Sequence, residues 1–116
     1  MHRKKPQRQG IELKKKHGQH FLKNGMYIVP MLEAVHVDNT ISVMEIGCGE
    51  GVLTHAILQG PCKQLKVFEI DQEWADYVNN LYGTDSRLHI ILNNVLDVDW
   101  SILQSDTPWV MLANLP

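Results

Sequence analysis

A loop with glycine at every second position is the part of this sequence best suited to chemistry. Residues 45–51 are Glu-Ile-Gly-Cys-Gly-Glu-Gly, and they end an apolar run at residues 41–46. Such a loop presents backbone N–H groups to a nucleotide-like ligand, and its glycines admit ligand atoms closer than a Cβ would. Two acids, Glu45 and Glu50, would repel a pyrophosphate at this place and favour a positively charged ligand.

The spacing of the glycines narrows the choice of ligand. A dinucleotide-binding loop has the pattern G-x-G-x-x-G, whereas this loop has G-x-G-x-G followed by Val52. S-adenosylmethionine, with its sulfonium and ammonium groups, suits the two acids, and its carboxylate suits the helix N-terminus that follows. Taken alone, the loop is equally typical of a tight turn, so the neighbouring segments must decide.

The segments around the loop predict an α/β fold with a mainly parallel sheet. Apolar segments predict four strands, at residues 41–46, 65–71, 88–92 and 109–113. Helical spacing predicts helices around residues 26–35 (with Pro30 opening or kinking the helix), between the loop and Gly60, between Asp71 and Gly83, and a short helix or turn at 98–103. Strands that alternate with helices predict parallel pairing and right-handed crossovers.

Four candidate site residues fall at or just past the ends of successive predicted strands: Gly47, Glu69, Asn94 and Asn114. In open α/β sheets, ligands bind at the carboxyl ends of the strands. Glu69 lies 22 residues after Gly47, where nucleotide-binding units place an acid that accepts hydrogen bonds from ribose hydroxyls. Asn94 is suited to the adenine edge, and Asp71 is expected to cap the following helix.

Charge is distributed very unevenly along the chain. Residues 1–23 hold eight basic residues against one acid, although the whole chain has a net charge of -2. Such an arm is a candidate contact for an RNA phosphate backbone. For residues 1–9 we favour a solvated tail or an expression remnant, and for residues 14–23 an RNA contact.

The composition indicates one small domain of 116 residues, of which 44% are hydrophobic and 21% charged. No apolar run approaches the ~20 residues of a membrane span, so we expect no membrane partner. Cys48 and Cys62 lack a metal or redox spacing, which favours free thiols in a reducing compartment. The histidines show no ligand spacing with these cysteines, and no metal is expected.

Four motifs together resemble one family. They are H-G-Q-H-F-L-K-N at 17–24, E-I-G-C-G-E-G at 45–51, F-E-I-D at 68–71 and A-N-L-P at 113–116. From about Lys14 onward the chain resembles the KsgA-type ribosomal RNA adenine dimethyltransferases. The resemblance implies the N-terminal half of a Rossmann-like S-adenosylmethionine-dependent methyltransferase fold. It also implies dimethylation of N6 of adenosines in small-subunit ribosomal RNA, with S-adenosylmethionine as cofactor and a cytoplasmic location.

The same resemblance assigns roles to individual residues. The implied cofactor contacts are His20, Leu22, Gly47, Glu69, Asn94 and Asn114. The implied catalytic motif is Asn114, Leu115 and Pro116. The family usually has an aspartate where Asn94 stands, which removes charge assistance from one hydrogen bond unless Asp97 substitutes.

The chain ends where the family motif continues with an aromatic residue, and family members have further strands and a helical C-terminal domain. We therefore expect an N-terminal fragment, with a basic arm at residues 1–23 and half a methyltransferase domain at residues 24–116. Without the aromatic platform for the target base we expect little or no activity from the fragment alone. Two alternatives stay open: an Erm-type large-subunit rRNA methyltransferase, and a non-catalytic RNA-binding or ribosome-assembly factor.

Overall fold

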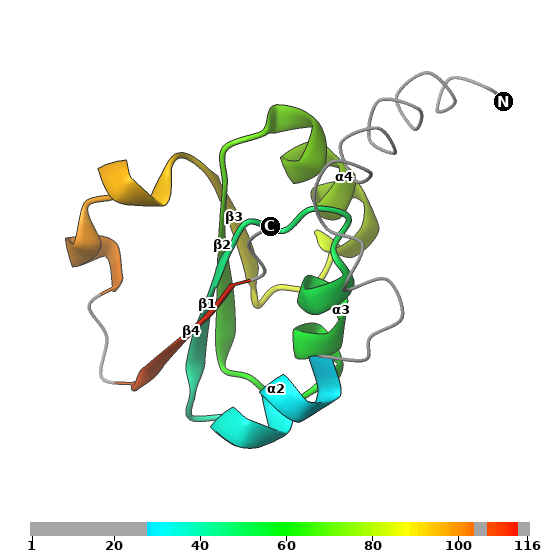
Figure 1. The fold of residues 1–116 in the computed structure, drawn as a ribbon, viewed down its shortest axis with the longest axis vertical. Coiled ribbons are helices and arrows are strands. Elements are labelled where there is room, and N and C mark those ends of the chain that lie inside the picture. The colour runs from blue at the N-terminus through cyan, green and yellow to red at the C-terminus, as the bar shows by residue number, and fades with distance from the viewer. Residues whose placement is uncertain (1–27, 104–106, 114–116) are drawn as a thin grey trace, which may run out of the picture.

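Four parallel strands form the centre of the computed structural model, which describes residues 28–103 and 107–113. Their order across the sheet is β3-β2-β1-β4 (Figure 1). The strands are β1 Ser42–Ile46, β2 Gln64–Glu69, β3 Leu88–Leu92 and β4 Trp109–Ala113. The helices are α2 Ile28–Val35, α3 Val52–Gln59 and α4 Gln72–Tyr82, with short 3₁₀ helices η2 Val95–Asp97 and η3 Trp100–Leu103. The predicted parallel α/β sheet is confirmed.

Strand β1 lies inside the sheet, between β2 and β4, and is buried on both faces along nearly its whole length. Its side chains alternate between the faces, as the two-residue period of a strand requires. Val43 belongs to the larger apolar cluster under the helices, and Met44 belongs to a smaller cluster on the other face. Glu45 shares the helical face with Val43, because it is bonded to Thr54 of α3.

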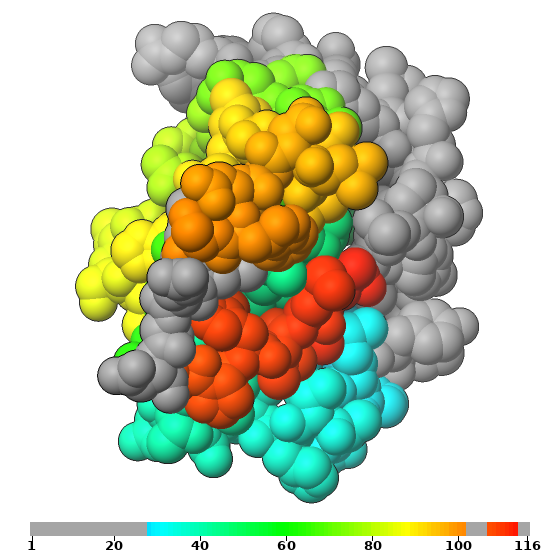
Figure 2. Space-filling model, turned by 90° about the vertical axis from the view of Figure 1, so that its left-hand side faces the viewer, coloured from blue at the N-terminus to red at the C-terminus, as the bar shows by residue number. Residues whose placement is uncertain are grey.

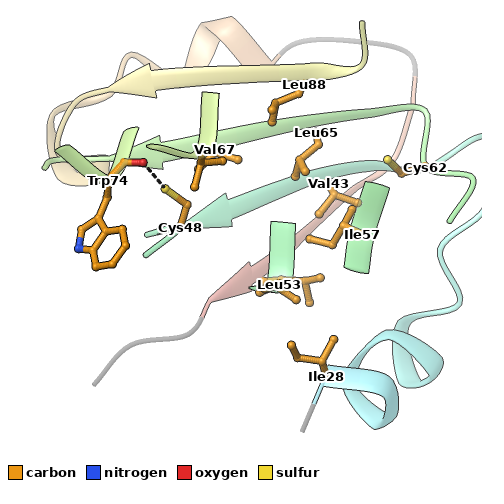
Figure 3. Close-up of a cluster of buried hydrophobic side chains, with 12 residues drawn as sticks. Ile28, Val43, Cys48, Leu53, Ile57, Cys62, Leu65, Val67, Trp74 and Leu88 are labelled. Atoms are coloured by element: carbon orange, nitrogen blue, oxygen red, sulfur yellow. Dashed lines mark hydrogen bonds between the residues drawn. The ribbon is translucent and has the colours of Figure 1, made fainter. Parts of the chain in front are cut away.

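The three helices cover one face of the sheet (Figure 1). Leu53 and Ile57 of α3 point into the cluster between helices and sheet, and Trp74 and Val78 of α4 extend it toward the carboxyl ends of the strands. Figure 3 shows this cluster with the strands above and α2 below, where Ile28 contributes its one buried side chain. Burial of this apolar surface is the main force that holds the helices on the sheet.

The opposite face has a thinner cover (Figure 2). Residues 95–103 lie over it, and Val98 packs with Met44 and Phe68 in the smaller cluster. The rings of Phe68 and Trp100 lie 6.4 Å apart, centroid to centroid. Met111 on β4, at one edge of the described sheet, is 61% exposed.

Several local predictions are confirmed and others are wrong. The Asp71 carboxylate accepts a hydrogen bond from the Glu73 amide at 2.9 Å and caps α4, as predicted. The second strand was expected to reach Asp71, but it ends at Glu69, and Ile70 is 70% exposed. The helical spacing of apolar residues between Asp71 and Gly83 places Leu81 on the same face as Trp74 and Val78 and predicts its burial, yet it is 50% exposed. Each error concerns a position near the end of an element, where the apolar pattern outlasts the regular backbone.

At the amino ends of the strands, one arginine fixes the end of α3. The Arg87 guanidinium donates hydrogen bonds to the backbone carbonyls of Leu58, Gly60 and Cys62. It also forms an ion pair with Asp85 at 2.9 Å, and this hydrogen bonding raises the pKa of Arg87 and lowers that of Asp85. The last carbonyls of α3 would otherwise lack partners inside the helix.

Within the described ranges, no helix is both long and apolar enough to cross a membrane.

Candidate functional site

The glycine loop joins β1 to α3 in a conformation that requires its glycines. Gly47, Gly49 and Gly51 have φ angles of 76°, 49° and 90°. These values lie in the left-handed region, which side chains other than glycine rarely enter. A Cβ added at Gly47 or Gly49 would meet no atom of the described residues within 4 Å, so the backbone there is open to a ligand. A Cβ at Gly51 would lie 3.1 Å from Tyr82, because the loop packs closely on α4 at that point.

Glu69, the last residue of β2, holds the loop in place. Its Oε1 accepts hydrogen bonds from the backbone amides of Cys48 at 2.8 Å and Gly49 at 3.4 Å. Its Oε2 accepts from the Asp71 amide at 3.0 Å. The Glu69 residue is only 6% exposed, so these hydrogen bonds to a carboxylate form in a sheltered place, where they are strong. One side chain thus joins the loop after β1 to the turn before α4.

The ends of β1 and β3 are both hydrogen-bonded to the backbone at the end of β2. The Gly47 amide donates to the Phe68 carbonyl at 2.8 Å, and the Asn93 amide donates to the Glu69 carbonyl at 3.0 Å. In the other direction, Ala113 at the end of β4 pairs with Ile46. The carboxyl ends of the strands therefore form one continuous rim, as the sequence predicted.

Cys48 lies inside this rim as a buried thiol. Its Sγ lies 3.4 Å from the Glu69 Oε1 and 3.8 Å from the Trp74 carbonyl, a contact drawn in Figure 3. Burial, with the nearby charges of Glu69 and Glu45, raises the pKa of the Cys48 thiol far above its ordinary value. A thiol in this state is a poor nucleophile, so it serves here as a donor and a packing group.

Asn94 occupies the rim two residues after β3. Its Oδ1 accepts a hydrogen bond from the Leu96 amide at 2.9 Å and caps η2, and its own amide donates to Asn93 Oδ1 at 2.7 Å. The residue is exposed. The structure thus gives Asn94 a capping role that the sequence did not reveal, while it leaves the side chain accessible from solvent.

Glu45 is the second buried carboxyl group of the site. It is 0% exposed, and the Thr54 hydroxyl donates to its Oε1 at 2.6 Å. Its Oε2 has no hydrogen-bond partner among the residues that the structure describes. Burial raises the pKa of Glu45 to about 8, helped by the negative charge of Glu69 and opposed by the Thr54 hydrogen bond. Its burial beneath the loop is not visible in the sequence.

The described site residues fit a positively charged nucleoside. The open backbone at Gly47 and Gly49 admits the ligand, and Glu69 and Asn94 supply hydrogen-bond acceptors on the same rim. The unpartnered oxygen of Glu45 supplies a buried acceptor for positive charge. Among the described residues, no group of three or more His, Cys, Asp or Glu side chains is placed to hold a metal ion.

The other candidate site residues lie outside the described part of the chain. They are His20 and Leu22 of the first motif and Asn114, Leu115 and Pro116 of the last. The structure brings together Gly47, Glu69 and the start of the turn that holds Asn94.

Known proteins with similar sequences include ribosomal RNA methyltransferases. A ribosomal RNA small subunit methyltransferase A from Coxiella burnetii is 32% identical over 106 residues, which are 91% of this chain and 41% of that protein. The chain thus spans less than half the length of this relative.

Two solved structures share the fold. A dimethyladenosine transferase from Plasmodium falciparum superposes with a TM-score of 0.63 at 24% identity, covering 78% of this chain and 31% of that one. The 23S rRNA methyltransferase ErmE superposes with a TM-score of 0.63 at 20% identity, covering 75% of this chain and 34% of that one. These likenesses establish a Rossmann-like methyltransferase fold.

The family model described as ribosomal RNA adenine dimethylase matches residues 10–116, which is nearly the whole chain. With the rim joined by Glu69 and the fold shared with methyltransferases, this chain belongs to the ribosomal RNA adenine dimethylase family.

Proposed function

We propose that this chain forms the cofactor-binding part of an enzyme that transfers methyl groups from S-adenosylmethionine to N6 of adenosines in small-subunit ribosomal RNA, giving dimethyladenosine. The observation that carries the proposal is the rim at which the Glu69 carboxylate joins the glycine loop to the turn after β2. Family membership supports the reaction, and a relative named ribosomal RNA small subunit methyltransferase A supports the RNA substrate.

Glu69 retains capacity for the ribose. A carboxylate offers about four lone-pair positions, and the three backbone amides at Glu69 occupy three of them. The position left on Oε2 suits a ribose hydroxyl at the rim. Asn94 Oδ1 accepts one hydrogen bond in η2 and has a second lone pair for the adenine amine. Gly47 supplies open backbone, and His20, Leu22 and Asn114 complete the proposed cofactor contacts.

We assign the chemistry at the target base to Asn114, Leu115 and Pro116. The bound cofactor supplies an electrophilic methyl group on its sulfonium. The exocyclic amine of adenine is a weak nucleophile, because its lone pair is delocalised into the ring. Acceptors at the Asn114 side chain and a backbone carbonyl of Leu115 or Pro116 would hold the two N–H bonds, localise the lone pair and offset the developing positive charge. Alignment of the nitrogen with the methyl group supplies further rate enhancement.

The division of the chain follows from the same proposal. Residues 1–23 would act as a basic arm on RNA phosphates, and residues 24–116 as the first half of the methyltransferase domain. The partner would be ribosomal RNA or the small ribosomal subunit, and the protein would act in the cytoplasm, where that substrate is found.

Cofactor titration tests the proposal. S-adenosylmethionine or its demethylated product should bind the chain with one site per molecule, measured by calorimetry. The Glu69→Ala variant should bind about tenfold or more weakly, because a charge-assisted hydrogen bond to the ribose contributes about 1.5–3 kcal/mol. Glu33→Gln, an exposed acid on α2, is the matched control and should bind like the unchanged chain. Binding of RNA without any binding of the cofactor would instead support a non-catalytic RNA-binding factor.

Methyl transfer tests the substrate. Labelled S-adenosylmethionine should mark N6 of adenosine in small-subunit RNA when the complete enzyme is supplied, and the 116-residue chain alone should show little or no turnover. Preferential labelling of large-subunit RNA would favour the Erm-type alternative over the small-subunit assignment.

A further inference from the structure

Glu45 and Glu69 are two buried acids of one site with very different surroundings. Glu69 receives three backbone N–H groups, whereas Glu45 receives one hydroxyl, from Thr54. Within the described part of the chain, the second oxygen of Glu45 has no hydrogen-bond partner, although the residue is completely buried. A buried polar atom without a partner is rare in folded proteins and calls for an explanation.

The position of Glu45 connects it to both ends of the glycine loop. It precedes Gly47 by two residues on β1, and its hydrogen bond reaches Thr54, three residues after Gly51 in the first turn of α3. A change in its charge is therefore felt where β1 enters the loop and where α3 leaves it.

The charges around Glu45 keep its proton in place while the loop is empty. The titratable groups on the surrounding elements are Lys66 and Glu69 of β2, Cys48 and Glu50 of the loop, His55 of α3, and Glu73, Asp76, Tyr77 and Tyr82 of α4. Strand β4, on the other side of β1, contributes no titratable group. Of these groups, Glu69 acts on Glu45 through its negative charge, and burial favours the neutral form further.

We propose that Glu45 is a positioning residue whose proton is exchanged for the positive charge of the cofactor. It is a neutral carboxylic acid when the loop is empty, and a carboxylate that faces the sulfonium or ammonium when the loop is filled. The O–H bond of Glu45 breaks on binding, its proton passes to solvent, and Thr54 keeps its hydrogen bond to Oε1 in both states. This inference rests on the proposed function, because it names S-adenosylmethionine as the cation.

Glu45 can release its proton on binding because the positive charge of the cofactor replaces it. A buried carboxylate is costly without a positive partner, and a cation within about 4–6 Å lowers the pKa of an acid enough to release its proton. Release of a proton makes the affinity for the cation depend on pH, by the same linkage that governs any proton-coupled equilibrium.

The test is calorimetric titration of the chain with S-adenosylmethionine at pH 6.0 and pH 7.0, where the ligand's ammonium keeps its proton. The dissociation constant should fall about tenfold between these values for the release of one proton. Titration at pH 6.5 in two buffers of different ionisation enthalpy should show the release of nearly one proton per ligand bound.

Two Glu→Gln variants separate Glu45 from other groups. Glu45→Gln keeps an oxygen for Thr54 but has no proton to release, so its affinity should be independent of pH, with no proton released. The exposed Glu33→Gln should behave like the unchanged chain. Thr54→Val keeps the Glu45 carboxyl and removes its donor; it provides a second test if Glu45→Gln does not fold. It should still release one proton and bind more weakly at pH 7.0.

Two results would overturn the inference. Tight binding with equal affinity at both pH values and no proton release would overturn the role of Glu45 and leave the proposed function intact. No binding at either pH by the folded chain would overturn both.

Discussion

Each end of α3 is held by a charged side chain that forms hydrogen bonds with backbone groups, an anion at one end and a cation at the other. At the carboxyl ends of the strands, the Glu69 carboxylate accepts hydrogen bonds from backbone amides of the glycine loop. At the amino ends, the Arg87 guanidinium donates hydrogen bonds to backbone carbonyls at and after the end of α3. Each charged group forms hydrogen bonds with backbone groups that the helix and its connecting segments leave without partners.

The two ends differ in what they leave open. Arg87 joins the end of α3 to Asp85 through hydrogen bonds and an ion pair. Glu69 fixes a loop in which a Cβ added at Gly47 or Gly49 would have no described atom within 4 Å. We infer that the Arg87 contacts serve stability, while the Glu69 contacts combine stability with room for a ligand.

The largest effect is expected at Glu45, which lies next to the Glu69 end but lacks its donors. The folded chain keeps the Glu45 proton up to about pH 8, whereas the unfolded chain loses it near the ordinary value of 4.5. The folded state therefore binds more protons between these values, and its stability should fall as pH rises, by on the order of 3–5 kcal/mol. Urea unfolding at pH 5 and pH 8.5 measures this fall. Glu45→Gln should remove this fall, and an equal fall in the variant would contradict the assignment.

The second-largest effect is expected when the Glu69 carboxylate is removed. Glu69→Ala leaves three backbone amides without their acceptor in a buried place, and should destabilise the chain by about 3 kcal/mol. Glu69→Gln retains one acceptor oxygen and should lose less. Thermal and urea unfolding at pH 7 compare the three proteins; equal stability of all three would show that Glu69 does not hold the loop.

Removal of the Arg87 guanidinium should lower the stability by less, because Arg87 is partly exposed and solvent replaces some of its hydrogen bonds. Arg87→Ala should destabilise by about 1–2 kcal/mol, and Arg87→Lys should recover only part, because lysine lacks the planar fork. Affinity of the folded chain for S-adenosylmethionine should stay unchanged. A loss of affinity at constant folding would mean that the two ends of α3 are coupled.

The smallest effect is expected at Asp71, which belongs to the Glu69 end but caps α4. Asp71→Ala should cost about 1 kcal/mol, the typical contribution of an N-cap side chain. Asp71→Asn should retain most of the stability, since an asparagine oxygen accepts the Glu73 amide equally well. A loss as large as that in Glu69→Ala would show that the cap also supports the loop.

The repeating elements of the fold were predictable from the sequence. The apolar segments at 88–92 and 109–113 coincide with β3 and β4, and the first strand differs by one residue at its start. Alternation of strand and helix then implied the parallel sheet, because the connections admit few other arrangements. The meeting of Gly47, Glu69 and the residues after β3 at one rim followed from that topology.

The interactions of single side chains across the chain were not predictable. The sequence spacing predicts that Glu69 accepts hydrogen bonds from a ribose. It gives no sign that the same carboxylate also accepts hydrogen bonds from three backbone amides. The hydrogen bond to the Asp71 amide turns the chain directly after Glu69, which explains why Ile70 left the predicted strand. The guanidinium of Arg87 reaches carbonyls more than 20 residues away, a distance that no local pattern encodes.

The two cysteines divide between the two ends of α3. The Cys48 thiol lies against Glu69, and the Cys62 sulfur lies 3.6 Å from the guanidinium of Arg87. Both thiols are buried and have raised pKa values, chiefly through burial, so alkylating reagents should reach them only when the chain around them opens. The rate at which each thiol is modified would then report the local opening of its end of α3. A bound cofactor should lower the modification rate of Cys48 more than that of Cys62.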